Sequence, residues 1–197
     1  MADAARRRMT PEEFFRWQEG QDEAFELADG MPRPRNRMMS GASAQHDLVK
    51  VNLIVALHRT LRGSAGRPMT GAVAIRTAAA TLRRPDVTVD CAPLVLDSYE
   101  AREPRLVVEV ASPSTTIVDR TVKLEEYKRH PSLRYIFLLE TVAPVALLYR
   151  REAEGWQPEL FEGLDAVIAL PEIGAELALA EIYDGLAFPP RITDAMR

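Results

Sequence analysis

Cysteine is almost absent from this sequence. The 197 residues contain a single cysteine, Cys91. One thiol cannot form an internal disulfide, and it cannot supply the clustered thiolates of a structural zinc site. Cys91 lies in a run that is typical of a β-strand, so we interpret it as a small buried apolar side chain. A disulfide framework and a thiol-bound zinc site are therefore both excluded.

Long hydrophobic runs are also missing. The longest strongly apolar stretch, residues 142–149, contains Pro144 and is far shorter than the ~20 residues that cross a bilayer. The amino terminus, MADAARRRMTPEEFFRW, is charged and lacks the apolar region and cleavage site of a secretory signal. We therefore expect a cytoplasmic protein that does not interact with membranes.

The sequence lacks an excess of positive charge. Its net charge at pH 7 is −4, whereas non-specific nucleic-acid binding depends on lysine and arginine side chains that neutralise phosphates. Any contact with phosphate must therefore come from a local patch. Arg33, Arg35 and Arg37 alternate along an extended segment and would share one face. Pro34 is equally consistent with a solvated sheet edge or loop.

The residues that are present indicate one globular α/β domain. Hydrophobic residues make up 47% of the chain and charged residues 27%, which is close to the average for soluble globular proteins. The length fits a single domain, and neither a repeat nor a low-complexity linker divides the chain. We expect residues 10–188 to form that domain, residues 1–9 to be a disordered tail, and residues 189–197 to be a second tail.

The order of local signals predicts a mixed sheet with a few helices against it. A helix is predicted from Thr10-Pro11, and Ala28-Asp29-Gly30 is typical of a hairpin turn that follows a strand carrying Glu26. Apolar residues at every fourth position predict a helix over about 43–61. The other expected elements are strands within 68–78, 82–91, 104–111, 134–141, 143–150, 155–161 and 166–170, a helix over about 116–131, and a short helix that ends at Gly185.

Two acidic residues within apolar strands are the first candidates for chemistry, because burying an unpaired charge is costly. Asp86 precedes VTV, and Glu109 interrupts LVVEV, a run typical of a strand that is buried on both faces. Carboxylates on neighbouring strands can hold a hard cation such as Mg²⁺. Alternatively, Glu109 binds an arginine such as Arg105 or Arg120, or it points outwards from an edge strand.

The helix that follows this strand offers a lysine. Asp119, Lys123 and Tyr127 are spaced four residues apart and share one helix face. Lys123 could point back at the carboxylates, where an ammonium group can orient an attacking water or stabilise negative charge on a phosphate. The alternative is an ordinary helical ion pair between Asp119 and Lys123.

In this order, the motifs resemble the Uma-two family of restriction endonucleases, a branch of the PD-(D/E)xK nuclease superfamily. The resemblance extends from about residue 9 to residue 186. It rests on MTPEEFFRW, FELADG, Gln45-His46, RRPDVTV, LVVEVASPST, DRTVKLEEY and LALAEIYDGL. It implies a restriction-endonuclease-like fold, which is a mixed β-sheet flanked by helices, with an N-terminal hairpin and C-terminal strands.

The resemblance also implies four catalytic residues. Asp86 and Glu109 match the two acidic residues of the superfamily motif and would bind metal. The usual lysine of the motif falls at position 111, where this chain has Ala111, and in this branch its place is taken by Lys123. Glu26 matches a glutamate from an early element and would be a further metal ligand, directly or through water.

The resemblance implies several further residues. The backbone carbonyl of Val110 would also bind the metal, as commonly happens for the residue after this glutamate. His46 matches a family position of undefined role, for which a structural role at the helix start is an alternative. The remaining candidates are Asp119 and Tyr127 as accessory residues, and Arg83, Arg84, Arg33 and Arg35 as phosphate contacts.

Two functions are compatible with these residues. The first is a Mg²⁺- or Mn²⁺-dependent endonuclease that hydrolyses phosphodiester bonds in DNA, in which the cation activates water and Lys123 positions it. The second is a catalytically inactive module of the same fold that acts in nucleic-acid binding or protein assembly. The joint presence of Asp86, Glu109 and Lys123 favours the endonuclease. By analogy with the superfamily, we expect a homodimer that cuts both strands.

Overall fold

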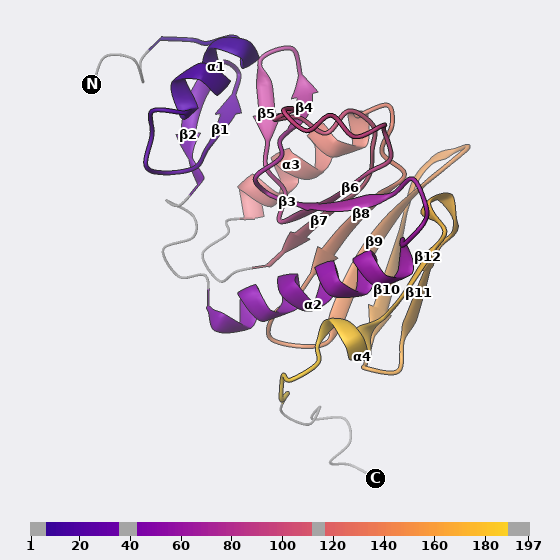
Figure 1. Ribbon diagram of the computed structural model, residues 1–197. Helices are drawn as coiled ribbons and strands as arrows, with labels where there is room; N and C mark the ends of the chain where they lie inside the picture. The colour runs from indigo at the N-terminus through magenta and orange to yellow at the C-terminus, as the bar shows by residue number, and fades with distance from the viewer. Residues whose placement is uncertain (1–6, 36–42, 112–116, 189–197) are drawn as a thin grey trace.

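The structure is a computed structural model that describes residues 7–35, 43–111 and 117–188, with residues 117–119 described by their backbone alone (Figure 1). In chain order, the elements are α1 (Pro11–Gln18), β1 (Phe25–Ala28), β2 (Met31–Pro34), α2 (Ala44–Thr60), β3 (Arg67–Thr70), β4 (Ile75–Ala78), β5 (Thr81–Arg83), β6 (Val87–Asp90), β7 (Pro104–Val110), α3 (Ile117–Arg129), β8 (Tyr135–Leu139), β9 (Val145–Glu152), β10 (Gly155–Glu162), β11 (Val167–Leu170), the 3-10 helix η3 (Pro171–Ile173), β12 (Ala175–Ala178) and α4 (Leu179–Ile182). The predicted tails lie mostly outside the described residues, so the domain boundaries stay predictions.

The N-terminal part of the chain is a four-stranded sheet beside α1. Asp29 and Gly30 have positive φ angles of 48° and 79°, as the two-residue turn between β1 and β2 requires. β5 pairs with both β1 and β4, so the strand order is β2-β1-β5-β4. The predicted Asp-Gly hairpin is confirmed, and its first strand carries Glu26. The predicted helix after Thr10 is confirmed as α1.

The central layer is a six-stranded mixed sheet in the order β10-β9-β8-β7-β6-β3. β7 and β8 are parallel and are joined through α3, and the other neighbouring strands are antiparallel. α2 lies against one face of this sheet and α3 against the other (Figure 1). Because side chains alternate along a strand, Val108 packs on the α2 side and Val107 on the α3 side. The next side chain, Glu109, therefore returns to the α3 side.

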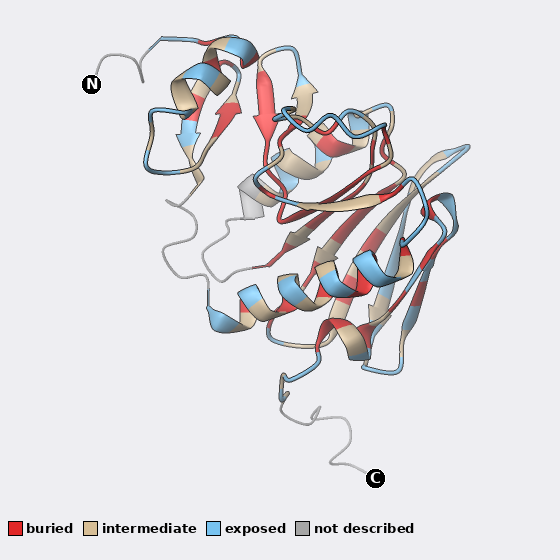
Figure 2. Ribbon diagram, in the orientation of Figure 1, coloured by how far each residue is buried: buried red, intermediate tan, exposed pale blue. Residues whose placement is uncertain are grey.

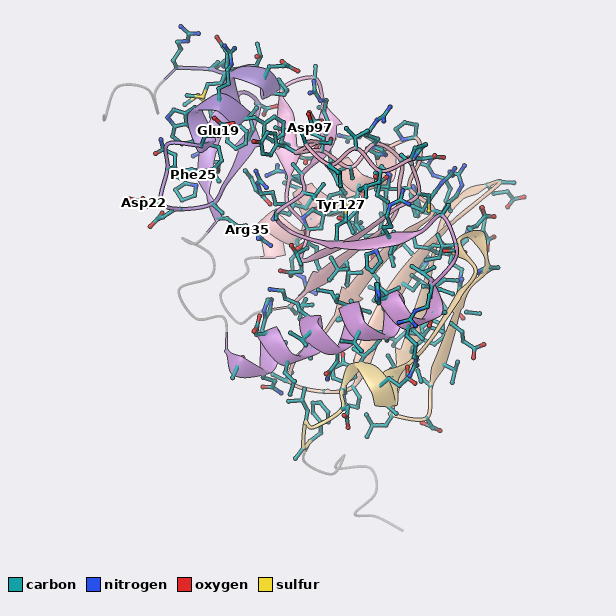
Figure 3. All side chains as sticks on the ribbon, in the orientation of Figure 1. Glu19, Asp22, Phe25, Arg35, Asp97 and Tyr127 are labelled. Atoms are coloured by element: carbon teal, nitrogen blue, oxygen red, sulfur yellow. The ribbon has the colours of Figure 1, made fainter. Side chains whose placement is uncertain are left out.

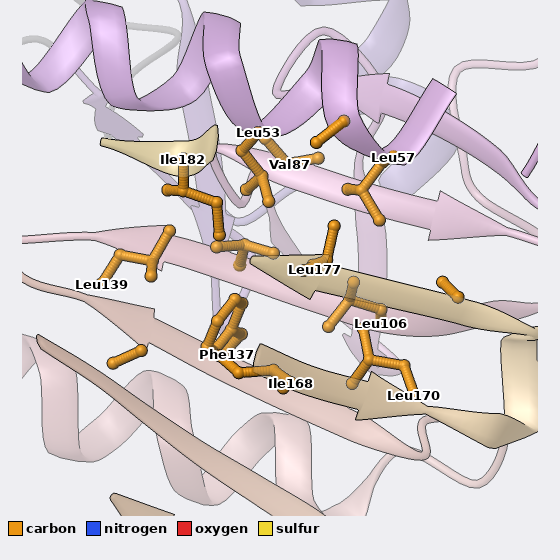
Figure 4. Packing of buried hydrophobic residues seen from close by; sticks show 14 of the residues in the cluster. Leu53, Leu57, Val87, Leu106, Phe137, Leu139, Ile168, Leu170, Leu177 and Ile182 are labelled. Atoms are coloured by element: carbon orange, nitrogen blue, oxygen red, sulfur yellow. The ribbon is translucent and has the colours of Figure 1, made fainter. Parts of the chain in front are cut away.

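The larger hydrophobic core lies between α2 and the central sheet. Leu53 of α2 is fully buried there together with Phe137 of β8 (Figure 4). The β11–β12 pair adds Ile168 and Leu177 to the same core. β6 is buried along its whole length, whereas the outer face of α2 is exposed (Figure 2). The predicted amphipathic helix is thus confirmed as α2, with Ser43 at its N-cap.

Two predicted strands are each broken in two. The run 68–78 forms β3 and β4 on either side of a turn that contains Gly71, and the run 82–91 forms β5 and β6. Pro85 lies at the second break, where it has no N–H to donate to a ladder. The chain leaves the N-terminal sheet there and enters the central sheet. β12 is not predicted from the sequence, because its residues AELA have low β propensity.

The remaining predicted helices and strands are present, and the α/β fold with its mixed sheet is confirmed. No helix within the described ranges is both long and apolar enough to span a membrane.

Candidate functional site

Asp86 and Glu109 lie at one end of the β6–β7 ladder. Val87 pairs with Val108 at the end of this antiparallel ladder, and Asp86 and Glu109 are the next residue of each chain segment. The backbone N–H of Val110 also donates a hydrogen bond to Asp86 Oδ2 at 3.0 Å. The break at Pro85 therefore brings two carboxylates and the Val110 backbone together.

Three groups compensate the charge of Asp86, whose side chain is buried. In addition to the Val110 N–H, Arg35 donates to Oδ1 at 3.3 Å, and Nε2 of His46 lies 3.5 Å from Oδ2. Burial alone would raise the pKa of Asp86, but the His46 contact, the Val110 N–H and the charge of Arg35 outweigh it and lower the pKa. Asp86 is therefore ionised at neutral pH.

His46 contributes a further unsatisfied group. Its ring is buried at the start of α2, and its Nδ1 atom has no hydrogen-bond partner within the described part of the chain. Because Nε2 faces Asp86, His46 links the first turn of α2 to the site. The structure thus places His46 beside a candidate metal ligand, in addition to its position in the first turn of the helix.

Glu109 is compensated less completely than Asp86. The hydroxyl group of Tyr127 donates to Glu109 Oε1 at 2.6 Å. Burial raises the pKa of Glu109, Lys123 lowers it, and the charges of Asp86 and Glu26 raise it further, with a net value of about 7. Glu109 is therefore close to half-protonated at neutral pH, mainly because it is buried and in part because Asp86 and Glu26 lie near it.

Glu26 and Lys123 are bonded to each other. Lys123 Nζ lies 3.1 Å from Glu26 Oε1, which also accepts the backbone N–H of Arg84 at 3.0 Å. Arg83 donates to the other oxygen, Oε2, at 3.2 Å. Burial would raise the pKa of Glu26, but Lys123, the Arg84 N–H and Arg83 lower it. The ammonium group of Lys123 is thus directed into the site from α3, as its spacing on that helix predicts.

Glu126 is the part of this network that sequence reasoning missed. Its carboxylate accepts two hydrogen bonds from Arg83, at 2.6 Å to Nε and 2.7 Å to Nη2, and a third from Thr77 at 3.0 Å. Glu126 comes three residues after Lys123 and therefore lies on the same helix face. That spacing, together with a buried arginine on the opposing strand, is the signal that could have found it.

The predicted phosphate contacts lie in two environments. Arg83 and Arg84 are buried, and the guanidinium group of Arg84 donates to the backbone carbonyls of Phe25, Gly71 and Ala72. Their role as phosphate contacts stays a prediction and would require them to leave these partners. Arg33 is exposed on β2.

Arg35 lies where the hairpin meets the rest of the molecule, whereas Tyr127 lies on α3 (Figure 3). Arg37 and the side chain of Asp119 lie outside the described residues.

The alternative partners considered for Glu109 are engaged elsewhere. Arg105 pairs with Glu103, and Arg120 pairs with Glu140 at 3.1 Å. The interpretation of Glu109 as an ordinary arginine ion pair is therefore wrong. Its partner is the Tyr127 hydroxyl, which leaves the carboxylate without a bonded cation in the described part of the molecule.

The donor set fits a hard divalent cation with few protein ligands. Within the described ranges, no group of three or more acidic, histidine or cysteine side chains is arranged to hold a metal ion. Glu26, expected as a further ligand, binds Lys123 and Arg83 instead. Asp86, Glu109 and the Val110 carbonyl remain, and Mg²⁺ commonly takes one or two protein carboxylates and keeps several waters. A cation there would also stabilise the ionised form of Glu109.

Comparisons with known proteins find similarity to a family model, to a curated relative and to a solved structure. Residues 11–180 match the model of the Uma2 family, described as "Putative restriction endonuclease". The "Uncharacterized protein slr1290" of Synechocystis sp. is 32% identical over 186 residues, which cover 92% of this chain and 94% of the relative. A crystal structure from Anabaena variabilis, described as "a putative nuclease belonging to DUF820", has a TM-score of 0.69 at 15% identity and covers 89% of this chain and 97% of its own. The structural match supports the restriction-endonuclease-like fold.

Proposed function

Because the chain belongs to the Uma2 family, we propose that it is a Mg²⁺- or Mn²⁺-dependent endonuclease that hydrolyses phosphodiester bonds in DNA. The observation that carries this proposal is the convergence of Asp86 and Glu109 from neighbouring strands with Lys123 from the crossover helix. Two carboxylates and an ammonium group, drawn from three separate segments, are the parts that phosphodiester hydrolysis needs.

Each residue has a distinct role in this proposal. Asp86, Glu109 and the Val110 carbonyl would hold the cation. When bound, a divalent ion acts as a Lewis acid that activates water and neutralises phosphate oxygens. Lys123 is close enough to lower the pKa of Glu109, and its ammonium group would orient the attacking water or stabilise charge on the phosphate. Glu26 positions Lys123, and Tyr127 positions Glu109.

A plasmid-nicking assay tests the activity. The purified protein should nick supercoiled DNA with Mn²⁺ or Mg²⁺, and Asp86→Asn should lose that activity. Since even outer-shell substitutions at metal sites cost about 10- to 100-fold, we expect the loss of a ligand to cost more than about 100-fold. The matched control is Asp97→Asn, which removes the same charge from an exposed loop and should cut like the wild type.

The same assay separates this proposal from the alternative of an inactive module. An inactive module would not cut DNA with either metal ion. Equal cutting by Asp86→Asn and wild type would assign the activity to a contaminating nuclease and contradict the proposal. The expected homodimer is part of the proposal, because two copies would supply one site for each strand. Light scattering in the presence of DNA would measure it.

A further inference from the structure

One carboxylate oxygen of Asp86 accepts its hydrogen bond from a long, flexible side chain. Its Oδ2 atom receives the backbone N–H of Val110 and faces His46, both of which belong to regular elements. Its Oδ1 atom accepts a hydrogen bond from Arg35 at 3.3 Å. Oδ1 is therefore the oxygen that an incoming ligand could take, and the Arg35 guanidinium is already there.

The backbone at Gly71 forms a seat for this guanidinium. A Cβ atom at position 71 would lie 2.5 Å from both Nη1 and Nη2 of Arg35 and 2.7 Å from its Cζ. The φ angle of Gly71 does not lie in the left-handed region, so the backbone itself does not require glycine. A methyl group at this position would instead force the flexible end of the Arg35 side chain to shift away.

The backbone of Arg35 is anchored independently of its side chain. Its N–H donates to the carbonyl of Ala24 at 2.8 Å, while its side chain retains 19% of its exposure. The neighbouring guanidinium of Arg84 repels it. The side chain thus has access to solvent while its backbone stays bonded to Ala24.

We infer that Arg35 is the resident cation of this site: it neutralises Asp86 in the metal-free protein and competes with a divalent metal ion for Oδ1. This inference rests on the proposed function, because it concerns the same acidic site. A metal ion that binds Asp86 displaces the guanidinium, and the cost of that displacement lowers metal affinity. The seat on Gly71 sets the strength of this competition.

Titration calorimetry with Mn²⁺ alone, without nucleic acid, tests the competition. Arg35→Gln should bind Mn²⁺ about tenfold more tightly than wild type, an effect of the size that one unit charge exerts at a partly exposed site. Gly71→Ala keeps the arginine but removes its seat, and should also tighten binding. The control Arg102→Gln removes the same charge from an exposed residue and should leave affinity unchanged.

Thermal unfolding gives a second readout that does not depend on catalysis. In EDTA, Arg35→Gln should melt below wild type, because Asp86 loses its cation. Added Mn²⁺ should then raise the melting temperature of the variant more than that of wild type.

Each outcome separates the inference from the proposed function. Suppose that wild type binds Mn²⁺ and that neither Arg35→Gln nor Gly71→Ala binds it more tightly. The inference that Arg35 competes with the metal ion is then wrong, but the proposed metal site is supported. Tighter binding by Arg35→Gln but not by Gly71→Ala would overturn the role of the seat. Equally tight binding by Arg102→Gln would assign the effect to overall charge and overturn the competition. If none of the proteins binds Mn²⁺, both proposals are overturned.

Discussion

The pKa of Glu109 depends on the burial and the charges of the whole site. Glu109 lies on a strand whose only other polar side chain is Arg105, and its hydrogen-bond partner is a neutral hydroxyl. Asp86 and Glu26, both ionised, add to the effect of burial. The ionised form of Glu109 is therefore unfavourable in the folded protein, and a bound cation would stabilise it.

This arrangement predicts how stability depends on pH. The pKa of Glu109 rises from about 4.5 in the unfolded chain to about 7 in the folded protein. Between these values the folded protein holds a proton that the unfolded chain has released, so the contribution of Glu109 to the free energy of unfolding falls as pH rises from about 4.5 to 7. In EDTA, Glu109→Gln should gain stability over wild type across this window, by up to about 3 kcal/mol.

Urea unfolding at several pH values measures this difference. The control is Glu125→Gln, which removes an exposed carboxylate from α3 and should show no such trend. An unchanged difference between Glu109→Gln and wild type from pH 4.5 to pH 7 would contradict the raised pKa.

At the scale of elements, α3 aligns the site with the N-terminal sheet. One face of this helix carries Lys123, which binds Glu26 of β1, and Glu126, which binds Arg83 of β5. Arg83 in turn binds Glu26, so the four side chains alternate in charge. Because these groups are largely buried, each depends on its partners for compensation.

The Arg83–Glu126 pair should therefore contribute strongly to stability. Glu126→Gln leaves the buried Arg83 without its bidentate partner, and we expect a loss of about 3 kcal/mol, as is typical when one member of a buried pair is removed. Chemical denaturation measures the loss. The comparison is Glu159→Gln, which breaks the more exposed pair with Arg150 and should cost less than about 1 kcal/mol.

A double-mutant cycle over Arg83→Met and Glu126→Gln isolates the interaction itself. If the two losses simply add, the two residues are not coupled, and the expected contribution of the pair to stability is wrong.

At the scale of the whole molecule, the site lies at the junction of two sheets. The N-terminal sheet supplies Glu26, the central sheet supplies Asp86 and Glu109, and α3 spans both. α2 packs on the opposite face of the central sheet, and its first turn brings His46 to Asp86. The geometry of the site therefore depends on how both helices pack against the strands.

The core under α2 predicts a large effect of truncation. Leu53 is fully buried between α2 and the sheet, so Leu53→Ala should lower the free energy of unfolding by about 2 to 5 kcal/mol. Val55 lies on the outer face of the same helix and is 61% exposed. Val55→Ala should change stability by less than about 0.5 kcal/mol. Similar losses for the two variants, measured by urea denaturation, would contradict this placement of α2.

Local sequence determined the elements of this protein. The Asp29-Gly30 turn and the cap at Thr10 depend on neighbouring residues alone, and the four-residue spacing of α2 requires only one apolar face. The family motifs likewise pointed to Asp86 and Lys123, which do lie at one site, although their roles stay predictions.

Only the tertiary structure decided the contacts between these elements. Arg35 and Asp86 are 51 residues apart, and Arg83 and Glu126 are 43 residues apart. The role of Gly71 depends on the Arg35 guanidinium, which packs against it from a distant part of the chain. No local pattern encodes such pairs, because they follow from the path of the chain between two sheets and from the burial that forces each charge to find a partner there.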